Sequence, residues 1–205
     1  MNWKLHVNIF LYIIGSCLFI IGSILFHPHF SKTDSLYKTG VLTFTFGSIL
    51  FGLGSLQQLL ANFRSISSNN NELLINEAKP FYMDLAISIC RNTIGSVNGF
   101  LFTIGSVAFW PTYGHCGSLV GNWMYRCGAF LGVVNSMWQL IRLQMKSTAM
   151  TTMKLLALLS LLGSIAFLVG GGYFLIGGKH DIEGSFVWLA GSVTFLLSSI
   201  LTYKL

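Results

Sequence analysis

The chain has 205 residues, of which 53% are hydrophobic and only 9% are charged. Soluble domains carry about 25% charged residues, so this composition excludes an ordinary soluble domain and indicates an integral membrane protein. The formal net charge of +6 comes from Lys and Arg residues scattered between apolar runs, which is typical of orientation signals and not of a nucleic-acid-binding surface. We therefore expect the lipid bilayer as the surroundings of the protein and no nucleic acid as a partner.

Six apolar segments reach or approach the length of about 20 residues that a membrane span requires. In chain order they cover residues of about 7–26, 39–61, 80–110, 122–143, 154–176 and 186–203. The first segment follows a lysine, as a signal peptide would, but it contains a Gly-Ser-x-x-Phe unit that recurs downstream. We therefore expect an uncleaved first helix. The sequence predicts an all-α integral membrane protein with six transmembrane helices.

Glycine recurs at seven-residue intervals in these segments, and the unit Gly-Ser-x-x-Phe occurs six times between residues 15 and 195. Residues seven apart lie on nearly the same face of a helix. Lipid tails are as apolar as Leu, so membrane helices associate where small residues let their backbones approach closely. We expect helix packing through Gly/Ser stripes that contain Gly15, Gly22, Gly47, Gly54, Gly105, Gly128, Gly163 and Gly191.

The six segments pair into three hairpins that resemble one another. The first helices align through Gly22, Gly105 and Gly163, and the second helices align through Gly47, Gly128 and Gly191. Because each unit holds two helices, all copies would share one orientation in the membrane. We predict a single membrane domain over residues 1–205, made of pseudo-repeats 1–62, 80–145 and 150–205 with a polar linker at 63–79.

Three stretches carry a resemblance to a known family. They are Gly22-Ser23-Ile24-Leu25-Phe26, Gly47-Ser48-Ile49-Leu50-Phe51 and the helix end Gln57-Gln58-Leu59-Leu60. With these motifs the chain resembles the YrhK-like family of small two-helix membrane domains, here as three tandem copies. The resemblance implies a helical-hairpin fold and no established activity.

The basic residues are distributed unequally between the two sides of the expected bundle. Seven Lys and Arg residues fall on the side of the termini and long linkers, against three or four on the side of the hairpin turns. Cytoplasmic loops carry the excess of Lys and Arg in membrane proteins. We therefore expect both termini in the cytoplasm of a cell or inner membrane.

Polar residues inside a bilayer are costly and therefore informative, and here they gather in the middle hairpin. Three of them are seven residues apart on its first helix, and an i, i+4 pair shares a face of its second helix. One interpretation is a polar track that passes an ion or small polar solute. The other is hydrogen bonding between helices, with the arginines reaching the interfaces. The track would contain Asp84, Arg91, Asn98, Arg126, Asn135 and Gln139.

Two functions therefore stay open. The first is a channel- or transporter-like protein that uses the polar middle hairpin. The second is a non-catalytic structural or interaction protein that assembles through its glycine stripes, and a homo-oligomer is compatible with both. The sequence contains no nucleotide-binding loop, nucleophile elbow or HExxH motif, and no pair of carboxylates for acid/base catalysis falls within the bundle. We expect neither an enzymatic activity nor a cofactor.

Histidines and cysteines gather near the turns opposite the termini. His27, His29, His115 and His180 fall there and are weak candidates for a metal or pH-sensing site, although none has a recognised ligand spacing. Cys116 and Cys127 flank an expected loop and the start of the next helix. A disulfide between these two cysteines is possible if that side is oxidising.

Overall fold

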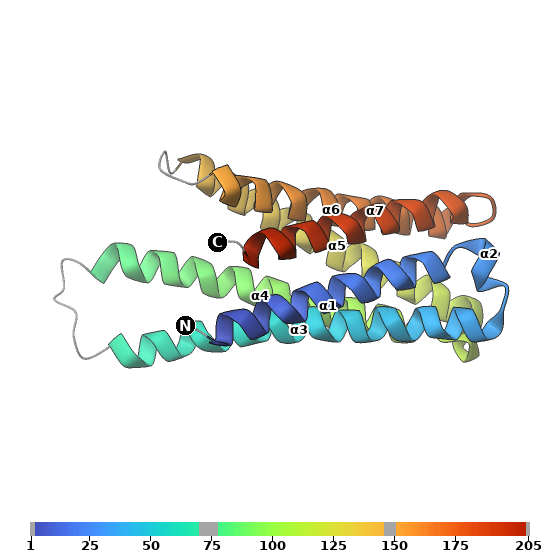
Figure 1. The fold of residues 1–205 in the computed structure, drawn as a ribbon, viewed down its shortest axis with the longest axis horizontal. Helices are drawn as coiled ribbons and strands as arrows, with labels where there is room; N and C mark the ends of the chain where they lie inside the picture. The colour runs from blue at the N-terminus through green and yellow to red at the C-terminus, as the bar shows by residue number, and fades with distance from the viewer. Residues whose placement is uncertain (1–2, 70–77, 146–150, 204–205) are drawn as a thin grey trace.

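Six long helices run side by side in the computed structural model, which describes residues 3–69, 78–145 and 151–203 (Figure 1). The described residues form helices and connecting turns, without strands, as the all-α prediction requires. The elements are α1 (Trp3–Leu25), α2 (Pro28–Ser31), α3 (Asp34–Asn69), α4 (Ala78–Ala108), the 3₁₀ turn η1 (Pro111–Tyr113), α5 (Gly114–Met145), α6 (Thr151–Ile176) and α7 (His180–Tyr203).

The long helices close into a ring. Each of α1, α3, α4, α5, α6 and α7 packs against the next in this order, and α7 packs back against α1. Both termini lie at one end of the bundle, where α3 and α5 end and α4 and α6 begin (Figure 1). The opposite end carries α2, η1 and the turn between α6 and α7. In the following, these are called the terminal end and the turn end.

Four of the helices are long and apolar enough to cross a membrane: α1, α3, α6 and α7. Helices α4 and α5 pass the same test only as a pair that is bent by 72° at the break between them, which raises the number of candidate spans to five at most. The sequence prediction of six spans is therefore not established by length and composition. The physical reason is the polar content of α4 and α5, which lowers their hydropathy.

Several helices extend beyond the apolar segments from which they were predicted. Helix α3 covers 34–69 instead of 39–61, α5 begins at Gly114 instead of residue 122, and α7 begins at His180 instead of residue 186. Acidic residues in the first turns of α3 and α7 favour these earlier starts, because a helix N-terminus attracts negative charge. Part of the expected linker 63–79 is consequently helical, and its residues 70–77 lie outside the described ranges.

Two turns depend on glycine. Helix α6 ends at Ile176 because Gly177 and Gly178 have φ values of 72° and 66°, a region that residues with a side chain rarely adopt. Gly114, between η1 and α5, has φ 55°. These glycines reverse the chain at the turn end, so that consecutive helices can pack along one another.

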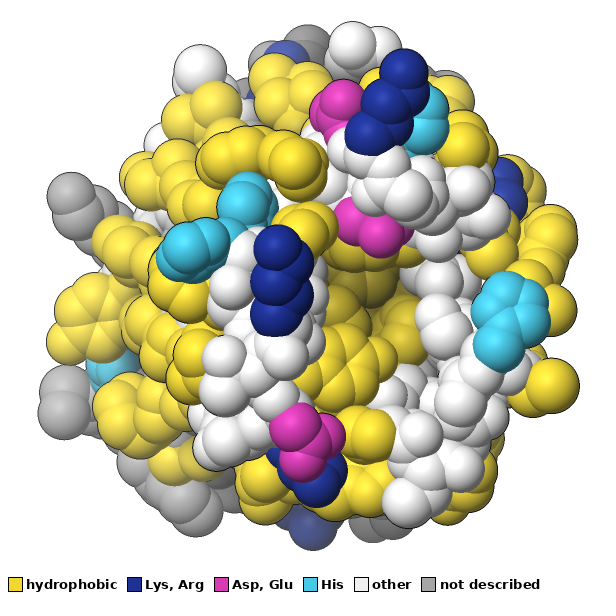
Figure 2. All heavy atoms as spheres, turned by 90° about the vertical axis from the view of Figure 1, so that its right-hand side faces the viewer, with side chains coloured by type: hydrophobic (Ala, Val, Ile, Leu, Met, Phe, Trp, Pro, Cys, Tyr) yellow, Lys and Arg dark blue, Asp and Glu magenta, His cyan; other side chains and the backbone are white. Residues whose placement is uncertain are grey.

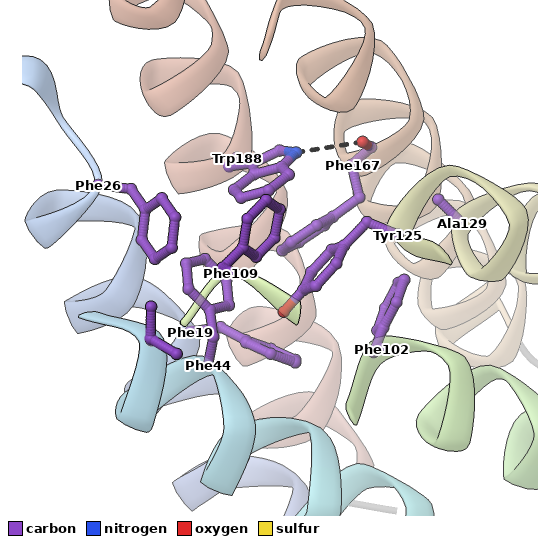
Figure 3. Packing of buried hydrophobic residues seen from close by; sticks show 10 residues of the cluster. Phe19, Phe26, Phe44, Phe102, Phe109, Tyr125, Ala129, Phe167 and Trp188 are labelled. Atoms are coloured by element: carbon purple, nitrogen blue, oxygen red, sulfur yellow. Dashed lines mark hydrogen bonds between the residues drawn. The ribbon is translucent and has the colours of Figure 1, made fainter. Parts of the chain in front are cut away.

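An aromatic cluster fills the centre of the ring (Figure 3). Each long helix contributes one aromatic residue that is at most 5% exposed: Phe19, Phe44, Phe102, Tyr125, Phe167 and Trp188. The ring of Tyr125 stacks on Phe102 with 4.7 Å between centroids and on Trp188 with 5.0 Å. The indole N–H of Trp188 donates to the carbonyl oxygen of Phe167 at 3.2 Å. Because aromatic rings occupy the axis of the bundle, its centre at this level is packed.

Glycines on one helix face aromatic rings on the next, and the pairs are reciprocal. Between α1 and α3, a Cβ added at Gly22 would lie 2.7 Å from the ring of Phe44, and one added at Gly47 would lie 3.2 Å from the ring of Phe19. Each ring stands three residues before the glycine on its own helix. The absent side chain of each glycine therefore makes the space into which the opposite ring fits, which brings the two backbones close together.

The same exchange occurs in the other two helix pairs. Its members are Gly105 with Tyr125 and Gly128 with Phe102 between α4 and α5, and Gly170 with Trp188 and Gly191 with Phe167 between α6 and α7. In this exchange Gly170 of α6 faces the ring of the neighbouring helix as Gly22 and Gly105 do, whereas the sequence alignment used Gly163. Gly163 instead faces Phe195, as Gly15 faces Phe51.

Candidate functional site

The eight glycines expected at helix contacts all lie against a neighbouring helix. Besides the pairs described above, Gly15 and Gly163 face phenylalanine rings, and a Cβ added at Gly54 would lie 2.9 Å from the ring of Tyr12. The sequence analysis missed a tighter contact, between Gly52 of α3 and Gly99 of α4, whose backbones touch. Gly95 and Gly99 lie four residues apart, and this spacing is itself a signal for close helix contact.

A pocket at the terminal end brings together most of the expected polar track. It encloses about 260 Å³ between α4, α5 and the beginning of α6. Four track residues line it: Asp84 and Arg91 from α4, and Asn135 and Gln139 from α5. The structure therefore places together side chains from the far ends of two consecutive helices.

The charges of this pocket are only partly balanced. A guanidinium N–H of Arg142 donates to a carboxylate oxygen of Asp84 at 2.5 Å, and both side chains are partly exposed. Arg91 and Arg142 line the same pocket. In the parts of the chain that the structure describes, no carboxylate forms an ion pair with Arg91. The pocket thus contains two guanidinium groups and one carboxylate.

Two residues of the expected track lie apart from the pocket. Asn98 faces α5, with its Oδ1 2.7 Å from the position of a Cβ at Gly128. The methylene chain of Arg126 lies against Gly171 of α6, and its guanidinium group stands 5.0 Å from the centroid of the Trp123 ring. Oδ1 of Asn98 and Nε of Arg126 are buried and have no hydrogen-bond partner among the described residues. The lining of this pocket therefore includes four of the six expected track residues and does not include Asn98 or Arg126.

Buried serines join neighbouring helix pairs at two of the three contacts between them. The hydroxyl groups of Ser48 and Ser106 lie 3.4 Å apart between α3 and α4, and those of Ser23 and Ser192 lie 3.2 Å apart between α1 and α7. Each serine directly follows a packing glycine in the sequence.

At the third contact, between α5 and α6, the residue after the glycine is Ala129 in α5 and Gly171 in α6. The methylene chain of Arg126 lies in the space at Gly171. This contact therefore differs from the other two in carrying a charged side chain.

A second polar cluster lies at the terminal end between α1, α3, α6 and α7. It surrounds a space of about 250 Å³. The amide of Gln58 donates to Oδ1 of Asn8 at 2.8 Å, and Nδ2 of Asn8 donates to the carbonyl oxygen of Gly54 at 2.6 Å. The sequence analysis treated the first and third hairpins as nearly free of polar groups and missed this cluster. Because its amides are bonded to one another, it links α1 to α3.

The histidines expected at the turn end are not assembled into a metal site. Within the described ranges, no group of three His, Cys, Asp or Glu side chains is placed to hold a metal ion. His27 packs edge-on against Phe186, and Nδ1 of His180 lies 4.0 Å from Glu183. Histidines and charged side chains lie on the rim of the turn end, around a hollow with hydrophobic walls (Figure 2). The hypothesis of a metal site at His27, His29, His115 and His180 is not supported.

The two cysteines considered for a disulfide are free thiols. Because α5 begins at Gly114, Cys116 and Cys127 lie on one helix and not across a loop. Eleven helical residues correspond to a rise of about 16 Å, whereas bridged cysteines have Cα atoms at most about 7 Å apart. A disulfide between these two residues of one chain is therefore excluded.

Comparison with known proteins identifies one part of the chain. Residues 6–63 match the family model of YrhK-like proteins. This region contains α2, nearly all of α1 and most of α3, whereas the pocket between α4 and α5 lies outside it. The match covers one helix pair, and it does not extend to the three tandem copies expected from the sequence. Searches of curated proteins and of solved structures found no match to this chain.

Proposed function

We propose that the protein is a channel- or transporter-like membrane protein that binds a small polar solute in the pocket between α4 and α5. The observation that carries this proposal is the convergence of Asp84, Arg91, Asn135 and Gln139 on one pocket. Polar and ionisable groups inside a membrane are costly, and they commonly mark a solute or ion pathway.

The proposal includes six membrane-spanning helices. Helices α4 and α5 have 31 and 32 residues, well above the about 20 that a span requires, and they run beside the apolar helices (Figure 1). It also includes three pseudo-repeated hairpins, since the reciprocal exchange of glycine and aromatic ring occurs in all three helix pairs. The family match to residues 6–63 covers the first of them.

Both termini are proposed to be cytoplasmic, because the terminal end carries the excess of Lys and Arg. In this orientation the pocket lies in the cytoplasmic half of the bundle. The aromatic cluster around Tyr125 then acts as the barrier on the axis of the bundle. Release of a solute on the other side would require helix movement, as in transporters whose helix bundles rock against one another.

A second candidate function is favoured by the same aromatic cluster. A packed centre suits a non-catalytic structural or interaction protein, since such a protein needs no pathway. The eight packing glycines face other helices of the same chain, so a homo-oligomer would form through other surfaces. The glycine stripes therefore support the fold of one chain better than the assembly of subunits.

Flux measurements on purified protein in phosphatidylcholine vesicles test the two candidates, with potassium, chloride and inorganic phosphate as probes. The key variant is Asn135→Leu, and the matched control is Val134→Leu on the exposed face of α5. We expect protein-dependent flux of at least one probe that Asn135→Leu abolishes and Val134→Leu preserves. Absence of flux for all three, or flux that Asn135→Leu leaves unchanged, would favour the structural role.

A further inference from the structure

We propose that the pocket between α4 and α5 binds an oxyanion, a phosphate or carboxylate group, with Arg91 as its charge partner. The proposal concerns the ligand class of the pocket described above and shares that pocket with the proposed function. It does not require that the ligand is transported, so binding and transport can be tested separately.

The first argument is the position of Arg91. It lies 13 residues after the first residue of α4, which corresponds to about 20 Å along the helix axis. A guanidinium group at such a distance from the helix end is costly unless a negative charge neutralises it. Among the described residues that line the pocket, the carboxylate is that of Asp84, and it is hydrogen-bonded to Arg142. An anionic ligand would supply the missing charge.

The second argument is the net charge of the pocket wall. Among the described lining residues, Arg91 and Arg142 outnumber the single carboxylate of Asp84, and both guanidinium groups are positively charged. Their repulsion disfavours a cation in the pocket and favours an anion between them. Arginine presents a planar set of donors that matches the oxygens of phosphate and carboxylate groups.

The third argument is the supply of further donors. The side-chain amides of Asn135 and Gln139 and the hydroxyl group of Ser88 also line the pocket. Within the described part of the chain, the amides of Asn135 and Gln139 have no hydrogen bond to another residue. Their N–H groups are therefore available to the oxygens of a bound oxyanion.

The remaining wall is apolar and indicates what can be attached to the oxyanion. Ile87, Ile94 and Trp138 line the pocket together with Met153 from the beginning of α6. An acyl chain or another apolar group could lie against these side chains while its charged head contacts Arg91. Basic pockets between membrane helices bind the head groups of anionic lipids in this manner. The same donors would also accept a free phosphate ion.

Cys90 provides a direct readout, because its exposed thiol lines the pocket next to Arg91. The test uses the full chain with Cys17, Cys116 and Cys127 replaced by serine, and it measures the rate of maleimide labelling at Cys90. The control retains Cys116, which is exposed at the beginning of α5 at the turn end, as its single cysteine. A site held at ten times its dissociation constant is empty about one-eleventh of the time, so labelling should slow about tenfold.

Two arms distinguish the source of the oxyanion. In the first, sodium phosphate is compared with sodium chloride at equal ionic strength in phosphatidylcholine nanodiscs. In the second, nanodiscs with phosphatidylglycerol are compared with nanodiscs of phosphatidylcholine alone. Protection of Cys90 but not Cys116 in the first arm indicates a free anion, and protection in the second indicates a lipid head group. Absence of protection in both arms overturns the proposal, and this test uses the protein with its native Arg91.

Arginine variants then test the charge partner. Arg91→Gln should remove the protection, and Arg91→Lys should retain most of it because the positive charge remains. Equal protection in Arg91→Gln and the parent protein would overturn the role of Arg91. Protection of Cys90 without flux would support the oxyanion site and contradict the transport function. Flux without protection of Cys90 would support transport and contradict the oxyanion site.

Discussion

The backbones of Gly52 and Gly99 touch where α3 crosses α4. A Cβ added at Gly99 would lie 2.5 Å from the Cα atom of Gly52 and 2.7 Å from its backbone nitrogen. In the opposite direction the space is ordinary, since a Cβ added at Gly52 would lie 3.7 Å from the Cα atom of Gly99. One contact therefore provides both a sensitive position and its matched control.

We expect Gly99→Ala to destabilise the protein and Gly52→Ala to leave it unchanged or more stable. Overpacking costs about 1–3 kcal/mol, while replacing a helical glycine by alanine gains up to about 1 kcal/mol. The free energy of unfolding should thus fall by up to about 2 kcal/mol in Gly99→Ala and rise slightly in Gly52→Ala. Thermal unfolding of both variants in one detergent measures the difference, and equal melting temperatures would contradict the close backbone contact.

The hydroxyl group of Tyr125 offers a second test of the packed centre. It lies 2.6 Å from the hydroxyl oxygen of Ser106, and the side chain is fully buried. Hydrogen bonds between membrane helices contribute about 0.6 kcal/mol on average. We expect Tyr125→Phe to lower the free energy of unfolding by about this amount, and the exposed Tyr113→Phe to have no effect. A larger loss in Tyr113→Phe than in Tyr125→Phe would show that the aromatic cluster is assembled differently.

The ion pair at the pocket should control its affinity for anions. Asp84→Asn removes the only described carboxylate of the pocket lining and leaves Arg91 and Arg142 in place. A change of about 1 kcal/mol in charge interaction corresponds to about fivefold in affinity. We therefore expect phosphate or phosphatidylglycerol to protect Cys90 at about fivefold lower concentration in Asp84→Asn. Asp34→Asn, which breaks the pair with Lys38 at the turn end, serves as the control, and weaker protection in Asp84→Asn would contradict the assignment.

The thiol state of the chain can be checked without any variant. All four cysteines are free and exposed. We expect four maleimide adducts per chain by intact mass after unfolding under non-reducing conditions, with no change after prior treatment with a reductant. Two adducts, rising to four after reduction, would reveal a disulfide and contradict the placement of Cys116 and Cys127 on one helix.

Local patterns in the sequence were sufficient for the helical class, for apolar helices of membrane-spanning length and for the positions of the glycines at helix contacts. Hydropathy and heptad spacing depend on residues close together in the chain, and a helix presents such residues on one face. The same reasoning missed the amide cluster around Asn8 and Gln58, because a single amide side chain changes the mean hydropathy of its apolar segment only slightly. It also chose Gly163 for the alignment, whereas Gly170 makes the exchange with Trp188, since seven-residue spacing leaves two registers open.

The closed order of the helices and the pocket could not be obtained in this way. Ser23 and Ser192, whose hydroxyl groups meet between α1 and α7, are 169 positions apart, and Arg142 and Asp84 are 58 positions apart. Such contacts depend on which helix faces meet, and the spacing of residues within one helix does not specify its neighbour. The division of the polar residues into a pocket group, with Asn98 and Arg126 lying apart, follows from that packing. Local chemistry thus determined the elements, and contacts between distant segments determined the site.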